Sequence, residues 1–229
     1  MPFFLALRSY GRKQGPVQSL ALACAAVLVA WSMQAGAAEA PVKIVALGDS
    51  LTAGHNLPTS AAFPAQLERA LKARGHAVEI ANAGVSGDTA SGGLARLDWS
   101  VPEGTDAVIV EFGGNDFLRG IDPRVTRKAL DAILRRLNER GLAVLLAGMR
   151  APPNLGGDYV RAFNAIFPDL AKMHDPVFYP FFLDGIATQS KFNLRDGIHP
   201  NAAGIAAIVE RVLPKAEDLI ARVRARRGR

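Results

Sequence analysis

The chain has 229 residues, of which 49% are hydrophobic and 21% charged, and its formal net charge is +6. These are the proportions of an ordinary globular protein. The single cysteine, Cys24, lies near the N-terminus. A mature chain without that region would have no disulfide, no thiolate metal site and no cysteine nucleophile.

The positive charge is concentrated at the two ends of the chain. Three cations lie within residues 1–38 and five within 222–229. The rest of the chain has 19 basic and 21 acidic residues. The remaining domain is nearly neutral, so we expect no nucleic-acid partner. The arginines of 222–229 are interpreted as a solvated helix end and a frayed tail, with weak contact to an anionic membrane surface as the alternative.

Residues 1–38 have the pattern of a secretory signal peptide. The cations Arg8, Arg12 and Lys13 precede an apolar run over 20–33, which is too short for a typical membrane span. Ala35-Gly36-Ala37 supplies a small-residue cleavage motif. We therefore expect cleavage near Ala37, export to the periplasm or medium, and one domain over 39–229, with an uncleaved anchor as the alternative. Nothing in the sequence demands more than a monomer.

The rest of the chain alternates β-like and helical segments. Apolar runs predict strands over 42–47, 78–83, 107–112, 143–148 and 177–182. Periodicity and end signals predict helices over 63–74, 124–140, 159–174 and 201–212. This alternation predicts an α/β fold with a parallel sheet covered by helices on both faces.

Glycine-rich polar loops follow the first four predicted strands. They are Gly48-Asp49-Ser50, 84–89, 113–116 and 150–157. The carboxyl ends of parallel strands meet at one edge of a sheet, where ligands bind. We therefore expect these loops to line one cleft.

Ser50, His199 and Asp196 are the parts of a serine-hydrolase triad. Ser50 offers the nucleophilic hydroxyl, and the Asp196-Gly-Ile-His199 turn offers a base with an acid beside it. On spacing alone this turn is equally typical of a plain helix start. The other histidines are expected in a turn, at a helix end or at the surface; they are His76, His174 and His55.

Three groups are candidate donors to the oxyanion that forms during acyl transfer. They are the N–H of Ser50, the N–H of Gly87 and the side-chain amide of Asn115. The alternative is that Gly87 and Asn115 only build turns. The sequence shows no metal-ligand cluster, and we expect neither a metal nor another cofactor.

The chain resembles the SGNH, or GDSL, hydrolase superfamily in four ordered blocks. These are Gly48-Asp-Ser-Leu51, the segment 82–89 with Gly87, Gly113-Gly-Asn-Asp116 and Asp196-Gly-Ile-His199. The match is closest to its exported bacterial branch of thioesterases, arylesterases and lysophospholipase-like enzymes, and it covers essentially the whole mature chain. A G-x-S-x-G elbow is absent, which argues against the α/β-hydrolase fold.

The resemblance implies a flavodoxin-like, three-layer α/β/α fold with a five-stranded parallel sheet. It implies a triad of Ser50, Asp196 and His199, with Gly87 and Asn115 as oxyanion donors, and makes Asp49 a structural turn residue. The expected activity is hydrolysis of carboxylic esters and thioesters, including acyl-CoA-type, aryl and lysophospholipid substrates. A carbohydrate O-acetylesterase and a non-catalytic crevice-binding protein are the alternatives.

Apolar residues in the later loops are candidates for the acyl pocket. They are Phe117, Pro152, Pro153 and Leu155, together with the pair Phe181-Phe182. Phe117 is expected either to limit acyl length or to pack behind its loop. At least one ring of the Phe181-Phe182 pair is expected in the core.

Overall fold

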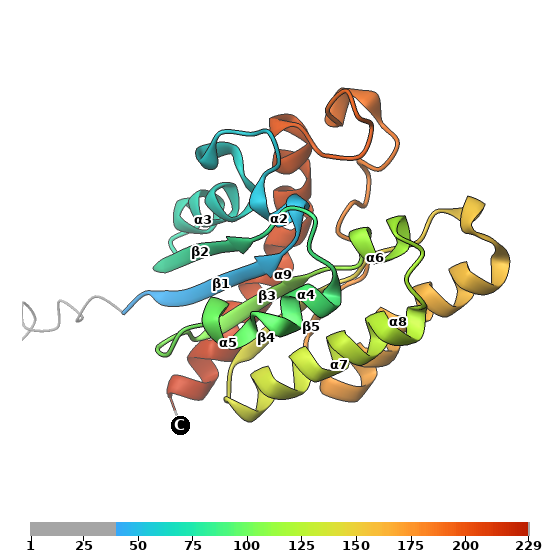
Figure 1. Ribbon diagram of the computed structural model, residues 1–229. Coiled ribbons are helices and arrows are strands. Elements are labelled where there is room, and N and C mark those ends of the chain that lie inside the picture. The colour runs from blue at the N-terminus through green and yellow to red at the C-terminus, as the bar shows by residue number, and fades with distance from the viewer. Residues whose placement is uncertain (1–39, 229) are drawn as a thin grey trace, which may run out of the picture. The chain divides into compact units, whose positions relative to one another are not determined.

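The computed structural model describes residues 40–228. The predicted signal peptide, residues 1–38, therefore lies outside the described residues. Five parallel strands form one sheet in the order β2-β1-β3-β4-β5 (Figure 1). The strands are β1 (Val42–Gly48), β2 (Val78–Gly84), β3 (Ala107–Glu111), β4 (Ala143–Ala147) and β5 (Val177–Tyr179). This order is flavodoxin-like, and the predicted α/β class with a five-stranded parallel sheet is confirmed.

The central strands are buried because helices cover both faces of the sheet. Every residue of β3 and β4 is buried, which explains their nearly continuous apolar sequence. The register places Gly48 of β1 opposite Glu111 of β3. Strands β1 and β3 therefore end side by side, and the loops that follow them begin at the same edge of the sheet.

Two groups of helices flank the sheet (Figure 1). Helix α3 (Phe63–Ala73) packs with α9 (Ala202–Arg227), while α7 (Pro123–Glu139) packs with α4 (Ala90–Ala95) and α8 (Gly157–His174). The shorter elements are α2 (Ser50–Ala53), η1 (Thr59–Ala61), α5 (Leu97–Ser100), α6 (Gly114–Leu118), η2 (Pro153–Leu155) and η3 (Ser190–Phe192). Each of these spans six residues or fewer, too few for a periodic apolar pattern, so the sequence analysis did not predict them.

The last two strands end earlier than predicted. Strand β4 stops before Gly148, whose N–H donates to Tyr179 O at 2.7 Å, and β5 stops at Tyr179. Phe182 is fully buried and packs edge-on against Phe63, with ring centroids 5.0 Å apart. The apolar sequence therefore continues beyond β5 because Phe182 packs in the core, not because the strand continues.

The C-terminal helix is much longer than the predicted 201–212. Asn201 is its N-cap, accepting from Gly204 N at 2.9 Å, and the helix continues past Pro214 to Arg227. Proline removes one backbone donor, yet buried Leu219 and Val223 extend the apolar face beyond it. Among the described residues no helix is both long and apolar enough to cross a bilayer.

Of the interpretation of 222–229, the helix end is confirmed, whereas the frayed tail is wrong for 222–227, because these residues are helical and contact the protein. Arg226 donates to Gly141 O at 2.7 Å, and Arg227 donates to Asp106 Oδ2 at 2.7 Å. Arg222 contacts Asp175. The side chains of Arg222, Arg226 and Arg227 thus contact residues that just precede strands of the sheet.

Candidate active site

Ser50 is placed by the turn that joins β1 to α2. Asp49 caps α2 and its Oδ1 accepts from Leu51 N at 2.9 Å. Gly48 must lack a side chain, because a Cβ there would lie 2.1 Å from Thr52 Oγ1 and 2.7 Å from Glu111 O. The close approach of this turn to β3 is therefore what fixes the backbone that carries Ser50.

Ser50, His199 and Asp196 form one hydrogen-bonded chain. His199 Nε2 lies 3.0 Å from Ser50 Oγ, and His199 Nδ1 lies 2.8 Å from Asp196 Oδ2. The structure thus brings together residues 149 positions apart in the sequence. The arrangement lets a base take the serine proton while an acid orients the base.

Asp196 is held in its ionised form by its own loop. Its Oδ1 accepts from His199 N at 3.0 Å and from Ile198 N at 2.9 Å. These backbone donors, with that of His199 the stronger, lower the pKa of Asp196 to about 2. At neutral pH this carboxylate can accept from His199 Nδ1 and balance a developing imidazolium.

Asn115 is the second residue of α6, which follows β3, and it lines the same cavity as Ser50. Its Nδ2 donates to Asp49 Oδ2 at 3.1 Å, which fixes the orientation of the amide. The amide nitrogen carries two hydrogens, so one remains for a substrate oxygen. An uncharged donor of this kind stabilises an oxyanion without attracting ground-state anions.

Gly87 lies in the loop between β2 and α4. Its φ of 87° is a left-handed conformation that glycine adopts without strain. Its carbonyl accepts from Arg119 Nη2 at 2.5 Å, which links the loop to the residue after α6. Gly87 does not line the cavity described below, and its role as an oxyanion donor stays a prediction.

Two buried carboxyl groups lie beneath the site. Asp49 is 1% exposed and Glu111 is fully buried, with Glu111 Oε2 accepting from Thr52 Oγ1 at 2.8 Å. Burial raises the pKa of Asp49 to about 6, against the opposing hydrogen bonds from Leu51 N and Asn115. Burial, and then the nearby Asp49 charge, raise the pKa of Glu111 well above its ordinary value.

Glu111 was missed as a notable residue by the sequence analysis. It ends a run of four apolar residues in β3, and a single acid within a buried strand is the signal that could have identified it. Burial thus favours the neutral form of both carboxyl groups, and of Glu111 more strongly. Asp49 accepts the hydrogen bond that orients Asn115.

A cavity of about 470 Å³ opens beside Ser50, His199 and Asn115. Of the predicted pocket residues Phe117, Pro152 and Pro153 line it, and so does Phe181. Leu155 does not, because the η2 turn carries it to the surface, where it is 36% exposed. Further apolar side chains complete the walls; they are Leu51, Leu118, Met149, Leu183 and Ile198.

Phe117 both lines the cavity and packs within the protein, and its effect on acyl length stays a prediction. It lines the cavity, and its ring packs edge-on against buried Phe163 with centroids 5.7 Å apart. Arg150 also lines the cavity, and its guanidinium lies 5.2 Å from the centroid of the Phe181 ring. The space is therefore apolar along its walls, with one cation among its lining residues.

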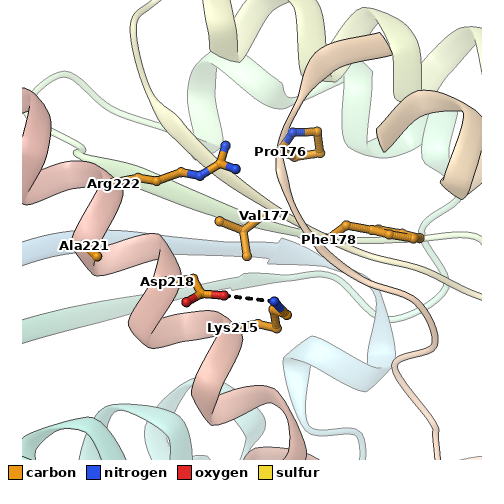
Figure 2. Close-up of a pocket in the computed structure, with 7 residues that line it drawn as sticks. All are labelled: Pro176, Val177, Phe178, Lys215, Asp218, Ala221 and Arg222. Carbon is orange, nitrogen blue, oxygen red and sulfur yellow. Dashed lines mark hydrogen bonds and ion pairs between the residues drawn. The ribbon is translucent and has the colours of Figure 1, made fainter. Parts of the chain in front are cut away.

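A second cavity, of about 460 Å³, lies between β5 and α9 (Figure 2). Its lining includes Val177, Phe178 and the ion pair of Lys215 with Asp218, whose charged atoms are 2.9 Å apart. Its strand residues come from the beginning of β5, whereas Ser50 follows the end of β1. None of the predicted site residues contributes to it.

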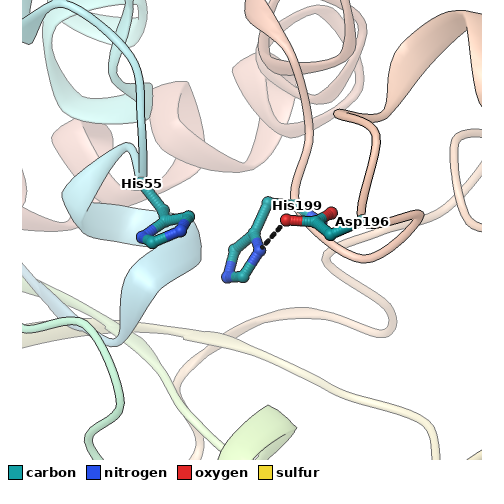
Figure 3. A group of neighbouring side chains, drawn as sticks. All are labelled: His55, Asp196 and His199. Carbon is teal, nitrogen blue, oxygen red and sulfur yellow. Dashed lines mark hydrogen bonds and ion pairs between the residues drawn. The ribbon is translucent and has the colours of Figure 1, made fainter.

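His55, which is expected at the surface from its sequence position, packs against the triad. Its ring lies 4.2 Å from that of His199, centroid to centroid, with 33° between the planes (Figure 3). His76 instead contacts Glu217 at 3.3 Å, and His174 contacts Asp131 at 2.7 Å. Ligand-type atoms of His55, Asp196 and His199 lie within 4.8 Å of one another, a grouping that leaves no local pattern because His55 is distant in sequence from the other two.

Comparison with known proteins decides the family. The GDSL-like Lipase/Acylhydrolase family matches residues 46–207. The chain belongs to this family of hydrolases. The matched region includes Ser50, Asn115, Asp196 and His199, so the hydrogen-bonded chain lies within the family domain.

Several esterases are similar to this GDSL hydrolase over most of their length. An arylesterase of Vibrio mimicus is 36% identical over 84% of this chain and 96% of the relative. A thioesterase 1/protease 1/lysophospholipase L1 of Escherichia coli is 37% identical over 84% of this chain and 90% of the relative. The crystal structure of AlinE4, a SGNH-hydrolase family esterase, is 41% identical with a TM-score of 0.67, covering 80% of this chain and 98% of that one.

Proposed function

We propose that this GDSL hydrolase is a serine esterase that cleaves carboxylic esters and thioesters through an acyl-enzyme. The observation that carries the proposal is the Ser50–His199–Asp196 chain opening into an apolar cavity of about 470 Å³. The relatives named as arylesterase and thioesterase support this substrate class. The protein acts alone on a small-molecule ester, thioester or lipid.

The first half of the reaction forms the acyl-enzyme. His199 Nε2 takes the proton of Ser50 Oγ as that oxygen attacks the acyl carbonyl carbon. Asp196 accepts from His199 Nδ1–H and stabilises the imidazolium. The carbonyl oxygen becomes an oxyanion, which accepts from Ser50 N–H, Gly87 N–H and Asn115 Nδ2–H.

The second half returns the enzyme to its starting state. The tetrahedral intermediate collapses, and His199 gives its proton to the departing alcohol, phenol or thiol. Water then loses a proton to His199 Nε2 and attacks the Ser50 ester. When this second intermediate collapses, His199 returns the proton to Ser50 Oγ and the carboxylic acid leaves.

The apolar walls favour an acyl chain over a sugar. A carbohydrate O-acetylesterase would need hydrogen-bonding groups for hydroxyls around the acetyl site. The side chains that line this cavity are mostly hydrocarbon, with Phe117, Phe181 and Leu183 among them. A non-catalytic binding role would not explain the hydrogen-bonded chain from Ser50 to Asp196.

Fluorophosphonate labelling and ester hydrolysis test the proposal. We expect covalent labelling of the parent and Ser86→Ala but not of Ser50→Ala, since Ser86 is an exposed serine in the loop after β2. Hydrolysis of p-nitrophenyl esters is expected to fall at least about a thousandfold in Ser50→Ala. Labelling that persists in folded Ser50→Ala would contradict the nucleophile, and hydrolysis restricted to acetyl groups would favour the carbohydrate esterase.

A further inference from the structure

The imidazole of His55 stands beside the triad without a part in the proposed reaction. Its ring overlaps that of His199, with 4.2 Å between centroids. One ligand-type atom from each of His55, Asp196 and His199 lies within 4.8 Å of the others (Figure 3). Two imidazoles and a carboxylate are a common ligand set for Zn²⁺.

The backbone ties His55 to the nucleophile. His55 N–H donates to Ser50 O at 3.1 Å, so the turn that ends α2 carries both residues. Asn56 Nδ2 lies 3.1 Å from His55 Nε2, and an amide N–H can only donate. In that contact His55 Nε2 is the acceptor, so its lone pair is engaged by Asn56, and a metal ion bound there would replace Asn56 as its partner.

We propose that His55, His199 and Asp196 form an inhibitory binding site for Zn²⁺. The side chains of His199 and Asp196 are 20% and 38% exposed, so an ion can reach the cluster from solvent. Zn²⁺ requires ligand distances of about 2.0–2.2 Å, so these side chains would turn toward a common centre on binding. Three protein ligands leave a fourth position for water.

Metal binding at this place removes the base from the reaction, whichever nitrogen of His199 it uses. Coordination through Nε2 takes the lone pair that faces Ser50 Oγ at 3.0 Å. Coordination through Nδ1 replaces the 2.8 Å contact with Asp196 and leaves the ring's proton on Nε2, which then cannot accept the proton of Ser50 Oγ. Inhibition by this route rests on the proposed esterase function, whereas the binding itself does not.

The activity test compares Zn²⁺ inhibition of the parent with that of His55→Phe and His76→Phe. Phenylalanine keeps a ring against His199 but offers no ligand atom. His76→Phe is the matched control, because His76 also contacts a carboxylate, Glu217, but no second imidazole. Hydrolysis of p-nitrophenyl acetate is measured against zinc chloride concentration, relative to each variant's own metal-free rate, and then again after EDTA.

We expect inhibition of the parent and of His76→Phe that EDTA reverses. In His55→Phe the half-inhibiting Zn²⁺ concentration should rise at least about tenfold, since losing even an outer partner of a metal ligand costs 10–100-fold in affinity. Equal sensitivity of the parent and His55→Phe would overturn the three-ligand site. Zinc would then act through the triad alone or elsewhere on the surface.

A binding measurement separates this proposal from the proposed esterase function. Calorimetric titration of zinc chloride into Ser50→Ala, which retains all three ligands, should give one site per chain, weakened at least about tenfold in Ser50→Ala/His55→Phe. If the parent hydrolyses no ester but this site is present, the esterase proposal fails and the metal site stands. Absence of the site from Ser50→Ala overturns the metal site whatever the esterase activity.

Discussion

An uncharged amide, held by a buried carboxylate, faces the place where the substrate carbonyl would lie. Asn115 donates to Asp49 at 3.1 Å, and Asp49 is in turn fixed by Leu51 N. The donor is thus oriented before any substrate arrives. Preorganised donors are effective because they need not reorient as the oxyanion forms.

Asn115→Ala should lower kcat by about 10²–10³-fold with little change in KM, because the lost hydrogen bond strengthens only in the transition state. Steady-state hydrolysis of a p-nitrophenyl ester measures this. Asn138→Ala, at an exposed asparagine near the end of α7, is the control. A kcat within about threefold of the parent in folded Asn115→Ala would exclude the amide from the oxyanion site.

Phe117→Ala should shift the preferred acyl chain toward greater length, because removing the ring enlarges the cavity beside Ser50. Rates for a series of p-nitrophenyl esters measure the shift. Phe178→Ala is the matched control, since Phe178 is half-buried and lines the other cavity (Figure 2). An unchanged chain-length profile would leave Phe117 with only its packing contact to Phe163.

At the scale of elements, the site depends on β1 and β3 ending side by side. Their register sets Gly48 against Glu111, and Thr52 of α2 donates to the Glu111 carboxyl at 2.8 Å. Glu111 and Asp49 are both buried, so the junction holds two acids in an environment that disfavours charge. Burying these two acids between β1, α2 and β3 therefore lowers the stability of the folded protein by an amount that depends on pH.

The direction of that dependence follows from the raised pKa values. As pH rises above about 4, these two carboxyl groups lose their protons in the unfolded chain but keep them in the folded protein. The free energy of unfolding therefore falls. For Asp49 the fall extends to its folded pKa of about 6, and for Glu111 it continues higher. Stability from these groups is therefore fully present in acid and lost toward neutral pH.

Glu111→Gln should lessen this loss, because a glutamine resembles the neutral glutamic acid and does not titrate. Between pH 5 and pH 8 the variant should lose less unfolding free energy than the parent. Denaturant unfolding at the two pH values measures this, with Glu103→Gln at an exposed site as the control. An equal loss in the parent and Glu111→Gln would show that Glu111 is ionised in the folded protein.

The sequence predicted the strand–helix alternation and the four loops at one edge because buried parallel strands and glycine-rich loops leave local patterns. It also predicted Ser50, Asp196 and His199, which the structure brings into contact, although their catalytic roles stay predictions. The pairing of His55 with His199 left no such pattern, since it arises only when two distant turns meet. The length of α9 was missed because Pro214 is a local stop signal that burial of Val223 overrides.

For the whole molecule, α9 runs from the site to the opposite end of the sheet. Its first turn follows the loop of His199, and its last turn contacts Pro41, Asp106 and Gly141. The final arginines therefore hold the beginnings of three strands. Their contacts favour a structural role for these cations over binding to an anionic membrane.

Removing residues 222–229 should lower the free energy of unfolding by about 2–4 kcal/mol, through lost burial of Val223 and several surface ion pairs. Thermal and denaturant unfolding measure the loss. Co-sedimentation with phosphatidylglycerol vesicles should be equally low for both proteins. Vesicle binding by the parent that is absent from the truncated chain would restore the membrane interpretation.

The separation of 149 residues between Ser50 and His199 has a consequence for synthesis of the protein. At 5–20 residues per second, the nucleophile is made about 7–30 s before its base. Until the last helix docks, the serine has neither a proton acceptor nor the far wall of its cavity. Under the proposed mechanism, the growing chain would therefore be unable to hydrolyse esters until the fold is complete.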